Sequence, residues 1–301
     1  MTQRDIPSHI KRRLRQEACF GCCVCGHPFI EYHHIIPFSE ARSHNASDMM
    51  ILCPIHHHQC TVGALDTTRQ LAAKSSPFNC TRGFANGQFV TSSTVIAIEA
   101  GSIQFIGAGF KLIVDGEPLL AIRSDSEGHL LLTVELYSST DELLLSIRDN
   151  EWIAGDPLPW DLEFGYNRLL LRSAARQIAL QIDARSLPVA ITGDLWRRNQ
   201  RFSIGRSSLH FDGEVQNVGF ANLGLVAMSL VADTTQRSFT LSPDTRLKGG
   251  MMVSWPDPAE RLQKGIEGFV ALCKRAHLGR NERCPCGSGH KVKACHPEYC
   301  A

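Results

Sequence analysis

Apolar and polar residues alternate in short runs through the middle of the chain, between about residues 89 and 255. Within 130–136 the apolar positions recur every second residue, and the same period appears at 143–147 and 178–182. Turn-forming pairs such as Asp115-Gly116 separate these runs. Many short strands spaced about 10–12 residues apart are typical of an all-β sandwich, barrel or solenoid. We therefore expect a β-rich middle region.

The apolar pattern is helical at both ends of the chain. Ile10, Leu14 and Ala18 fall on one face of a helix predicted over 7–18, and residues 258–277 carry a similar stripe. Between the first helix and the β-rich region, two short strands (29–36 and 49–52) precede a helix that begins near residue 54.

The sequence thus predicts an α+β protein in three parts. The first is a small head domain at 1–80. The second is an all-β spacer or assembly domain at 81–257, built as a solenoid or a sandwich. The third is a C-terminal helix followed by a knuckle, at 258–301.

The twelve cysteines gather at the two ends of the chain. Seven lie between Cys19 and Cys80, five lie between Cys273 and Cys300, and none lies between them. Eight of the thirteen histidines come before residue 60. The N-terminus has no apolar signal-peptide core, and clustered cysteines in such a chain indicate metal sites in a reducing cytoplasm rather than a disulfide framework. We therefore expect a cytoplasmic, metal-binding protein.

Two pairs of residues near the N-terminus have the spacing of a tetrahedral zinc site. Cys22 and Cys25 form a Cys-x-x-Cys unit, and Cys53 and His56 form a Cys-x-x-His unit. Each pair projects its ligands from one turn, as tetrahedral zinc requires. The neighbouring cysteines at 19 and 23 are alternative ligands, although neither precedes Cys25 at the same spacing.

Further histidines lie inside this zinc set. The run EYHHIIP, from Glu31 to Pro37, followed by the stretch from Asp48 to His57, resembles the HNH endonuclease family, which has a ββα-metal fold. The resemblance covers roughly residues 10–80. It implies that His33 and His57 bind the catalytic divalent cation. It also implies that His34 is the general base that activates water and that Glu31 orients the site.

Two departures from the family pattern bear on this cation. Asp48 stands where the family usually has Asn, and a carboxylate is a harder ligand that favours Mg²⁺ or Mn²⁺. Thr61 stands where some members have a third metal-binding histidine. We therefore expect Asp48 to join His33 and His57 around one divalent cation, Mg²⁺, Mn²⁺ or a similar ion. Water and phosphate would complete its coordination.

The stretch from Gly279 to His296 resembles the SEC-C motif, a short zinc knuckle, through its Cys-Pro-Cys-Gly-Ser-Gly core. The resemblance implies a second structural zinc ion. Its ligands would be Cys284, Cys286, Cys295 and His296. Because this knuckle mediates partner contacts in its family, we expect a protein partner at this end.

The net charge of +1 is unevenly distributed along the chain. Residues 1–80 carry +2, residues 81–260 carry −6 and residues 261–301 carry +5. We expect DNA to contact the basic ends, because the phosphate backbone repels an acidic surface. Four basic residues within the first predicted helix form either a solvated face or a phosphate-contacting surface: Lys11, Arg12, Arg13 and Arg15.

Two expectations concern other partners. No apolar run approaches the ~18–20 residues of a membrane span, so we expect no membrane partner. Short strands leave sheet edges that must be covered. A solenoid or strands shared between copies would cover them, and so would a closed monomeric sandwich. We expect a homo-oligomer formed through the β domain, with the monomeric sandwich as the alternative.

The HNH resemblance implies a metal-dependent endonuclease that hydrolyses DNA phosphodiester bonds. A role in defence against foreign DNA, or in a mobile element, is consistent with this combination of parts. Hydrolysis needs an activated water and a cation that stabilises charge on the phosphate, and a histidine with a pKa of about 6.5 can serve as the base at neutral pH. The alternative is a zinc-stapled DNA-binding or partner-docking protein that does not cleave.

Overall fold

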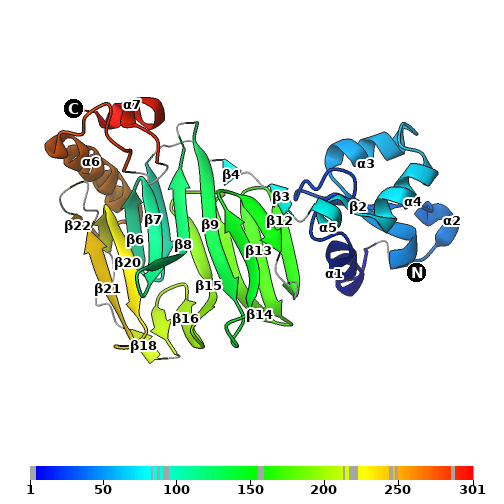
Figure 1. The fold of residues 1–301 in the computed structure, drawn as a ribbon, viewed down its shortest axis with the longest axis horizontal. Helices are drawn as coiled ribbons and strands as arrows, with labels where there is room; N and C mark the ends of the chain where they lie inside the picture. The colour runs from blue at the N-terminus through cyan, green and yellow to red at the C-terminus, as the bar shows by residue number, and fades with distance from the viewer. Residues whose placement is uncertain are drawn as a thin grey trace.

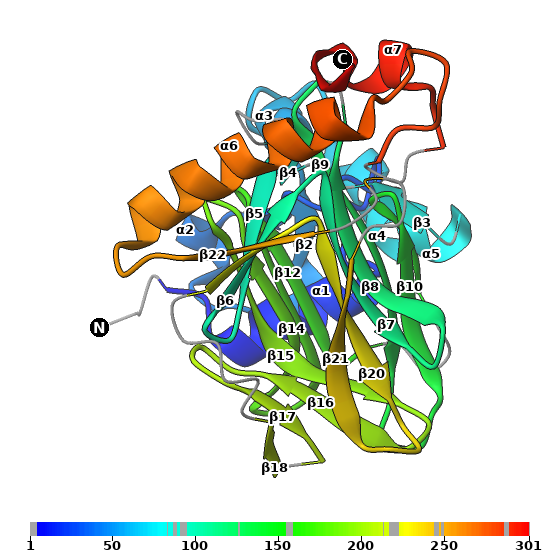
Figure 2. The same ribbon diagram turned by 90° about the vertical axis from the view of Figure 1, so that its left-hand side faces the viewer.

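The computed structural model of the chain describes residues 5–82, 84–86, 89–90, 95–125, 127–154, 159–212, 214–216, 223–243, 247, 250–285 and 289–300. It contains an N-terminal head (residues 5–82), a β-rich body and a C-terminal segment that begins at residue 257. The head lies at one end of the body, and the long C-terminal helix crosses the other end (Figures 1 and 2). The predicted α+β class is confirmed.

The head contains the predicted β-β-α order. Its elements are α1 (Ser8–Glu17), β1 (Glu31–His34), α2 (Phe38–Ala41), the 3-10 turn η1 (Ala46–Asp48), β2 (Met49–Leu52), α3 (Pro54–Thr61), α4 (Thr67–Ser75) and α5 (Phe78–Arg82). Strands β1 and β2 are antiparallel, with Glu31 opposite Leu52 and His34 opposite Met49. All of β2 is buried, and Leu14 of α1 belongs to the same buried cluster. The head therefore has a small core of its own.

A disulfide bond joins Cys19, which follows α1, to Cys80 in α5. Cys19 and Phe20 adopt left-handed conformations with φ of 46° and 62°, which turn the chain after α1. Asn79 Nδ2 donates hydrogen bonds to the carbonyls of Cys19 and Gly26, at 3.3 and 3.1 Å. The expectation that clustered cysteines indicate metal sites rather than disulfides is therefore wrong for Cys19 and Cys80.

The first sheet of the body has strand order β21-β20-β7-β8-β9-β10-β11-β3, and β4 also pairs with β9. Its strands are β3 (Phe84–Asn86), β4 (Phe89–Val90), β7 (Gly109–Val114), β8 (Glu117–Ser124), β9 (His129–Tyr137), β10 (Leu143–Arg148), β11 (Glu151–Ala154), β20 (Met228–Asp233) and β21 (Ser238–Pro243). The alternation at 130–136 falls within β9, in which every second residue is buried.

The second sheet has strand order β12-β13-β14-β15-β5-β6-β19-β22, with β16, β17 and β18 added in succession from β15. Its strands are β5 (Ile96–Ala100), β6 (Ile103–Gly107), β12 (Asp161–Gly165), β13 (Arg168–Ala174), β14 (Gln177–Asp183), β15 (Val189–Arg197), β16 (Gln200–Ile204), β17 (Leu209–Phe211), β18 (Glu214–Gln216), β19 (Leu223–Val226) and β22 (Met251–Ser254). In the described part of the body, three strand pairs are parallel: β5 with β15, β6 with β19 and β7 with β20.

The two open sheets pack face to face as a sandwich. One buried cluster combines Phe110 and Leu120 of the first sheet with Ile98, Phe105 and Leu180 of the second. The rings of Phe105 and Phe110 meet across this core with centroids 4.7 Å apart. Of the two expected architectures, the sandwich is therefore confirmed and the solenoid is not formed.

Helix α1 attaches the head to β12, the edge strand of the second sheet. Arg15 Nε and Nη2 donate to the two carboxylate oxygens of Asp161 at 2.8 and 2.6 Å, and both side chains are more than nine-tenths buried. Gln16 Nε2 donates to the Trp160 carbonyl at 2.6 Å, and the Arg12 guanidinium lies 4.1 Å from the Trp160 ring centroid. The head thus covers a sheet edge whose backbone groups would otherwise lack partners.

The C-terminal segment consists of α6 (Pro258–Ala276), α7 (Val292–Cys295) and the 3-10 turn η2 (Pro297–Tyr299). Asp257 caps α6 by accepting from two backbone N–H groups of its first turn, at 2.9 Å each. Gly265 permits close packing on β6, because a Cβ there would lie 2.2 Å from Cδ1 of Ile106. The predicted helix at 258–277 is confirmed. None of the helices in the described part of the chain combines the length and apolarity that a membrane span requires.

Candidate metal centres

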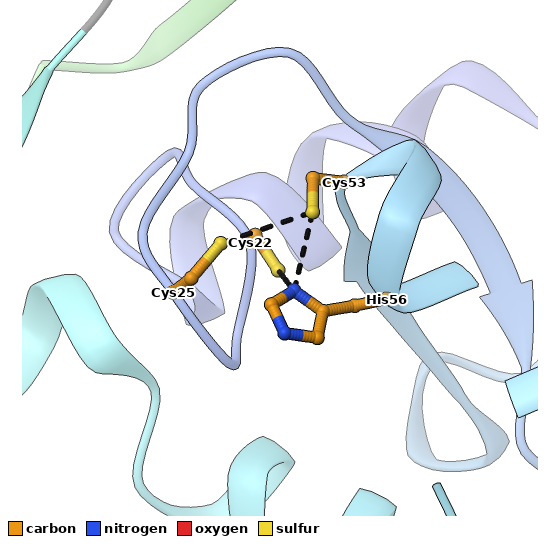
Figure 3. Close-up of side chains that lie close together, drawn as sticks. All are labelled: Cys22, Cys25, Cys53 and His56. Carbon is orange, nitrogen blue, oxygen red and sulfur yellow. Dashed lines mark hydrogen bonds between the residues drawn. The ribbon is translucent and has the colours of Figure 1, made fainter. Parts of the chain in front are cut away.

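Four side chains of the head converge at the expected zinc set (Figure 3). The ligand atoms of Cys22, Cys25, Cys53 and His56 all lie within 4.8 Å of one another. His56 Nδ1 is 3.2 Å from Cys53 Sγ and 3.5 Å from Cys22 Sγ, and the Sγ atoms of Cys25 and Cys53 are 3.8 Å apart. Zinc bonds of about 2.0–2.3 Å place tetrahedral ligands about 3.3–3.8 Å apart. The four residues therefore fit a metal ion such as zinc.

Local backbone structure brings the two ligand pairs together. Gly26 has a φ of +76°, and a Cβ there would lie 2.1 Å from Asn79 Oδ1, so the turn after Cys25 requires glycine. Cys53 is the N-cap of α3 and Pro54 occupies its first turn, so the helix begins directly at the ligand. The hydrogen bond from Cys25 lowers the pKa of Cys22 to about 5. That direction favours the thiolate that a metal ion binds.

A second group of side chains comes from β1, α3 and α4. The rings of His33 and His57 meet edge to face, with centroids 5.1 Å apart. Glu31 Oε2 accepts from His57 Nδ1 at 2.6 Å, and Gln70 Oε1 accepts from His33 Nε2 at 3.2 Å. Each histidine therefore has an oxygen acceptor on one ring nitrogen, which leaves the other nitrogen as a ligand. Metal-binding histidines typically have this arrangement. Among the described residues, however, these side chains do not form a group of three ligand atoms within 4.8 Å of one another.

Gln70 is a site residue for which the sequence gives no signal. It lies in α4, its side chain is buried, and its Nε2 donates to the Leu65 carbonyl at 2.7 Å. That donation orients the amide so that Oε1 is the atom that meets His33 Nε2. Because an amide oxygen only accepts, Nε2 must carry the ring proton and Nδ1 is the free ligand atom. Burial is the largest cause that lowers the pKa of His33.

His34 makes contacts separate from those of His33. Its Nε2 lies 3.1 Å from Nδ1 of His44, and its ring lies 5.6 Å from that of Phe38. Burial lowers the pKa of His34, and the neighbouring His44 lowers it further. Adjacent residues on a strand face opposite sides, which explains why the two histidines have different surroundings.

Asp48 is not brought into one ligand group with the paired histidines. Its carboxylate accepts from Ser47 Oγ at 2.9 Å at the end of η1. Among the described residues, the set of His33, His57 and Asp48 is not a cluster with ligand atoms within 4.8 Å of one another. His33 and His57 meet as expected, whereas the structure does not bring Asp48 to them.

The basic flank of α1 is used largely for contacts within the chain. Arg13 pairs with Glu17 at 2.7 Å, and Lys11 Nζ lies 5.5 Å from the Tyr32 ring centroid. Arg12 lies over Trp160, as described above. For Arg15 the phosphate-contacting alternative is wrong, because its buried guanidinium is already paired with Asp161.

The second cluster lies in the C-terminal segment. The ligand atoms of Cys284, Cys295 and His296 lie within 4.8 Å of one another, and all three residues are buried. Cys284 Sγ is 3.1 Å from His296 Nδ1, and the His296 ring stacks on Tyr299 with centroids 4.7 Å apart. The fourth expected ligand, Cys286, lies outside the described residues.

Residues 280–296 match the family model of the SEC-C motif. The match includes all four expected ligands of the C-terminal knuckle and confirms the resemblance at this end. SEC-C is a zinc-binding motif, so the second cluster is also a candidate zinc site. The match does not extend to the head, where the HNH resemblance stays a prediction. No curated protein and no solved structure matches the chain.

Proposed function

We propose that the chain is a metal-dependent HNH endonuclease that hydrolyses DNA phosphodiester bonds. The observation that carries the proposal is the pair formed by His33 and His57, which lies next to a zinc set that already has four ligands. These two histidines are not needed as ligands of a structural zinc ion, because the four other residues complete its coordination. The order β1-β2-α3 also supports the proposal, because it is the order of the ββα-metal fold.

The roles of the residues follow from their contacts. His33 and His57 hold a divalent cation, with Mg²⁺ or Mn²⁺ as the expected ions, and Glu31 orients His57. The cation, when bound, stabilises the negative charge that develops on the phosphate and on the leaving oxygen. Fixing the tautomers of the two ligands before DNA arrives leaves less reorganisation for the reaction itself.

His34 is the general base of this proposal. Burial lowers its pKa, so the ring is neutral at neutral pH and can accept a proton from water. In this proposal Nε2 of His34 donates to Nδ1 of His44, so Nδ1 of His34 is the nitrogen that accepts a proton from the attacking water. The C-terminal knuckle has no part in this chemistry, and we assign it to contact with a protein partner.

A plasmid-nicking assay with Mg²⁺, Mn²⁺ or Ni²⁺ tests the proposal. His34→Ala should reduce cutting by about 10²–10⁴-fold, the usual contribution of a general base. Zinc content and DNA binding should stay unchanged, because His34 is not in the zinc set. His129→Ala is the matched control. His129 pairs with Asp125 in the body, outside the head, so this variant should cut DNA as the wild type does.

Two results would count against this function. Undiminished cutting by His34→Ala would remove the assigned base. A wild-type protein that binds DNA but cuts it with none of the three cations would favour the non-cleaving DNA-binding alternative.

A further inference from the structure

A groove that the proposed nuclease chemistry does not use lies on the outer face of the second sheet. Two adjoining cavities of about 560 and 510 Å³ lie over β14, β15 and β16. Both are lined by Ile178, Thr192 and Gly205, so they form one continuous groove. Each volume is within the range of small-molecule sites, about 300–1,000 Å³, but the first cavity is shallow and largely open to solvent.

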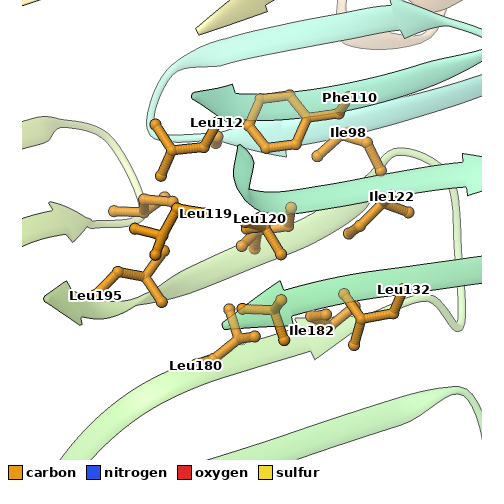
Figure 4. Packing of buried hydrophobic residues seen from close by; sticks show 14 of the residues in the cluster. Ile98, Phe110, Leu112, Leu119, Leu120, Ile122, Leu132, Leu180, Ile182 and Leu195 are labelled. Carbon is orange, nitrogen blue, oxygen red and sulfur yellow. The ribbon is translucent and has the colours of Figure 1, made fainter. Parts of the chain in front are cut away.

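Strand alternation places this groove opposite the core. Leu180, Ile182 and Leu195 point into the space between the two sheets (Figure 4). Successive residues of a strand face opposite sides, so Asp194, which precedes Leu195, lies on the outer face. Thr192 lies on the same face, and both residues line the first cavity. The groove is therefore a surface feature and not a defect in core packing.

Gly193 marks the point where β15 changes partners. Thr192 still pairs with Gln181 of β14, whereas Gly193 pairs with Ile204 of β16. A Cβ at Gly193 would lie 2.3 Å from the Ala179 carbonyl oxygen, so only glycine allows β14 this close. The first cavity lies at this junction and is lined by the start of β14 and by β16.

The first cavity contains a row of hydrogen-bonding side chains. Asp194, Ser203 and His210 lie opposite one another across β15, β16 and β17. Ser203 Oγ donates to Asp194 Oδ1 at 2.5 Å, and Ser208 Oγ lies 2.8 Å from His210 Nε2. These bonds hold the side chains in place before any ligand arrives. The row therefore resembles the preorganised polar lining of a binding site.

The first cavity also has an excess of positive charge. Arg176 and Arg201 both line it, and among the described residues neither side chain is part of a salt bridge, although the charge of Asp212 acts on Arg201. Of the described residues that line the cavity, Asp194 is the one carboxylate, and it already accepts from Ser203. Two guanidinium groups at one hollow favour an anion, because their paired N–H donors match the oxygens of phosphate or carboxylate.

The second cavity has a different character. Arg206 and Glu99 give it one group of each sign, and Asp183 is neutralised by Arg185 at 2.5 Å. Gln181 and Thr192 add uncharged polar groups to its lining. This half of the groove is suited to the hydroxyl or amine groups of a ligand.

We propose that the groove binds a small organic phosphate. The phosphate lies in the first cavity between Arg176 and Arg201, and the polar remainder extends past Thr192 into the second cavity. Duplex DNA is a poor occupant, because residues 81–260 carry a net charge of −6 and repel a polyanion of that length. The site is separate from the head and does not depend on the proposed nuclease activity.

Isothermal titration calorimetry of the full-length protein tests this site. The probes are adenosine 5′-monophosphate, ribose 5-phosphate and glycerol 3-phosphate, with inorganic phosphate for comparison. At least one ester should bind with a Kd of about 1 mM or less and more tightly than inorganic phosphate. Arg176→Gln and Arg201→Gln should each weaken that binding about tenfold, the effect of one lost charge-assisted contact.

Arg148→Gln is the matched control, because this exposed arginine lies on β10 in the other sheet. It should bind the ester as the wild type does, and all variants should keep their zinc content and melting temperature. Failure of all three esters to bind at millimolar concentration would overturn the proposal. The proposal would also be overturned if Arg148→Gln weakened ester binding as much as the two groove variants do, or if inorganic phosphate bound as tightly as the esters. If none of the esters binds and a short DNA duplex binds in a way that requires Arg176 and Arg201, the proposal is overturned and the groove is a nucleic-acid site.

Discussion

Two oxygen acceptors determine which nitrogen each paired histidine can offer to a cation. Glu31 accepts a hydrogen bond from Nδ1 of His57, and Gln70 accepts one from Nε2 of His33. The two rings therefore present different nitrogens, Nε2 and Nδ1. Glu31 lies two residues before His33 in a recognisable motif, whereas Gln70 comes from a helix 37 residues further along the chain. The proposed cation site would thus depend on an element outside the ββα unit.

Replacement of Gln70 tests this dependence. Gln70→Leu should weaken Mn²⁺ binding about 10–100-fold, because His33 loses the acceptor that fixes its tautomer. Gln70→Glu keeps an acceptor oxygen and should retain most of the affinity. Electron paramagnetic resonance of free Mn²⁺ measures both, with Gln236→Leu in the β20–β21 turn as a control. Equal affinity in the leucine and glutamate variants would show that Gln70 does not position His33.

At the scale of elements, the contact between α1 and β12 is the main joint between head and body. Arg15 and Asp161 form a bidentate pair at this joint, and Arg15 also contacts the Tyr32 hydroxyl on β1. Tyr32 immediately precedes His33. The strand that carries the candidate cation ligand is therefore connected through one arginine to the edge of the body.

Asp161→Asn should destabilise the protein by about 3 kcal/mol, because the buried Arg15 guanidinium loses its bidentate carboxylate and keeps only Glu163, 3.6 Å away, as a counter-charge. Asp183→Asn is the matched control: its partner Arg185 is largely exposed, and such pairs contribute about 0–1 kcal/mol. Urea unfolding followed by tryptophan fluorescence measures both. A difference of less than about 1 kcal/mol between the two variants would contradict a structural role for the joint.

The elements show where sequence reasoning succeeds and where it stops. The helix expected at 7–18 is α1, and the run at 143–147 lies in β10, because both depend on local periodicity. The zinc ligands were predictable because their spacing is local. The pairing of β5 with β15 was not predictable, because nothing in the sequence around Ile98 or Val189 indicates that these two residues are neighbours. The contact of Arg15 was equally unpredictable. Its positive charge suggests exposure to solvent or contact with phosphate, and nothing in the sequence indicates that Asp161 is its partner.

At the scale of the whole molecule, the candidate zinc sites lie at opposite ends of the sequence. We expect two zinc ions per chain by elemental analysis, with a further divalent cation bound less tightly. Cys284→Ser should remove one zinc and leave DNA cutting intact. Cys25→Ser should unfold the head, because a domain of this size has too small a core to fold without its metal. A single tightly bound zinc in the wild type would contradict this prediction.

The open sheets predict assembly of several copies. The head covers the β12 edge, whereas β21 ends the first sheet at the opposite end (Figure 1) and pairs only with β20 among the described residues. Light scattering after size exclusion should therefore give a mass of at least twice 33.3 kDa. Thr240→Lys places a charge on β21 and should return the mass to that of one chain. A wild-type monomer at micromolar concentration would refute assembly and leave the nuclease proposal standing.

The three parallel strand pairs determine what can fold while the ribosome is still delivering the chain. The head has all four candidate zinc ligands within residues 22–56, so it can fold soon after it leaves the exit tunnel. The body cannot fold at that stage, because Ile98 pairs with Val189 and Leu112 pairs with Leu230, and these partners are synthesised much later. During most of synthesis β5, β6 and β7 therefore lack their parallel partners. A nascent chain at that stage combines a folded head with strands that each still have one open edge, a form that is prone to aggregation and bound by chaperones.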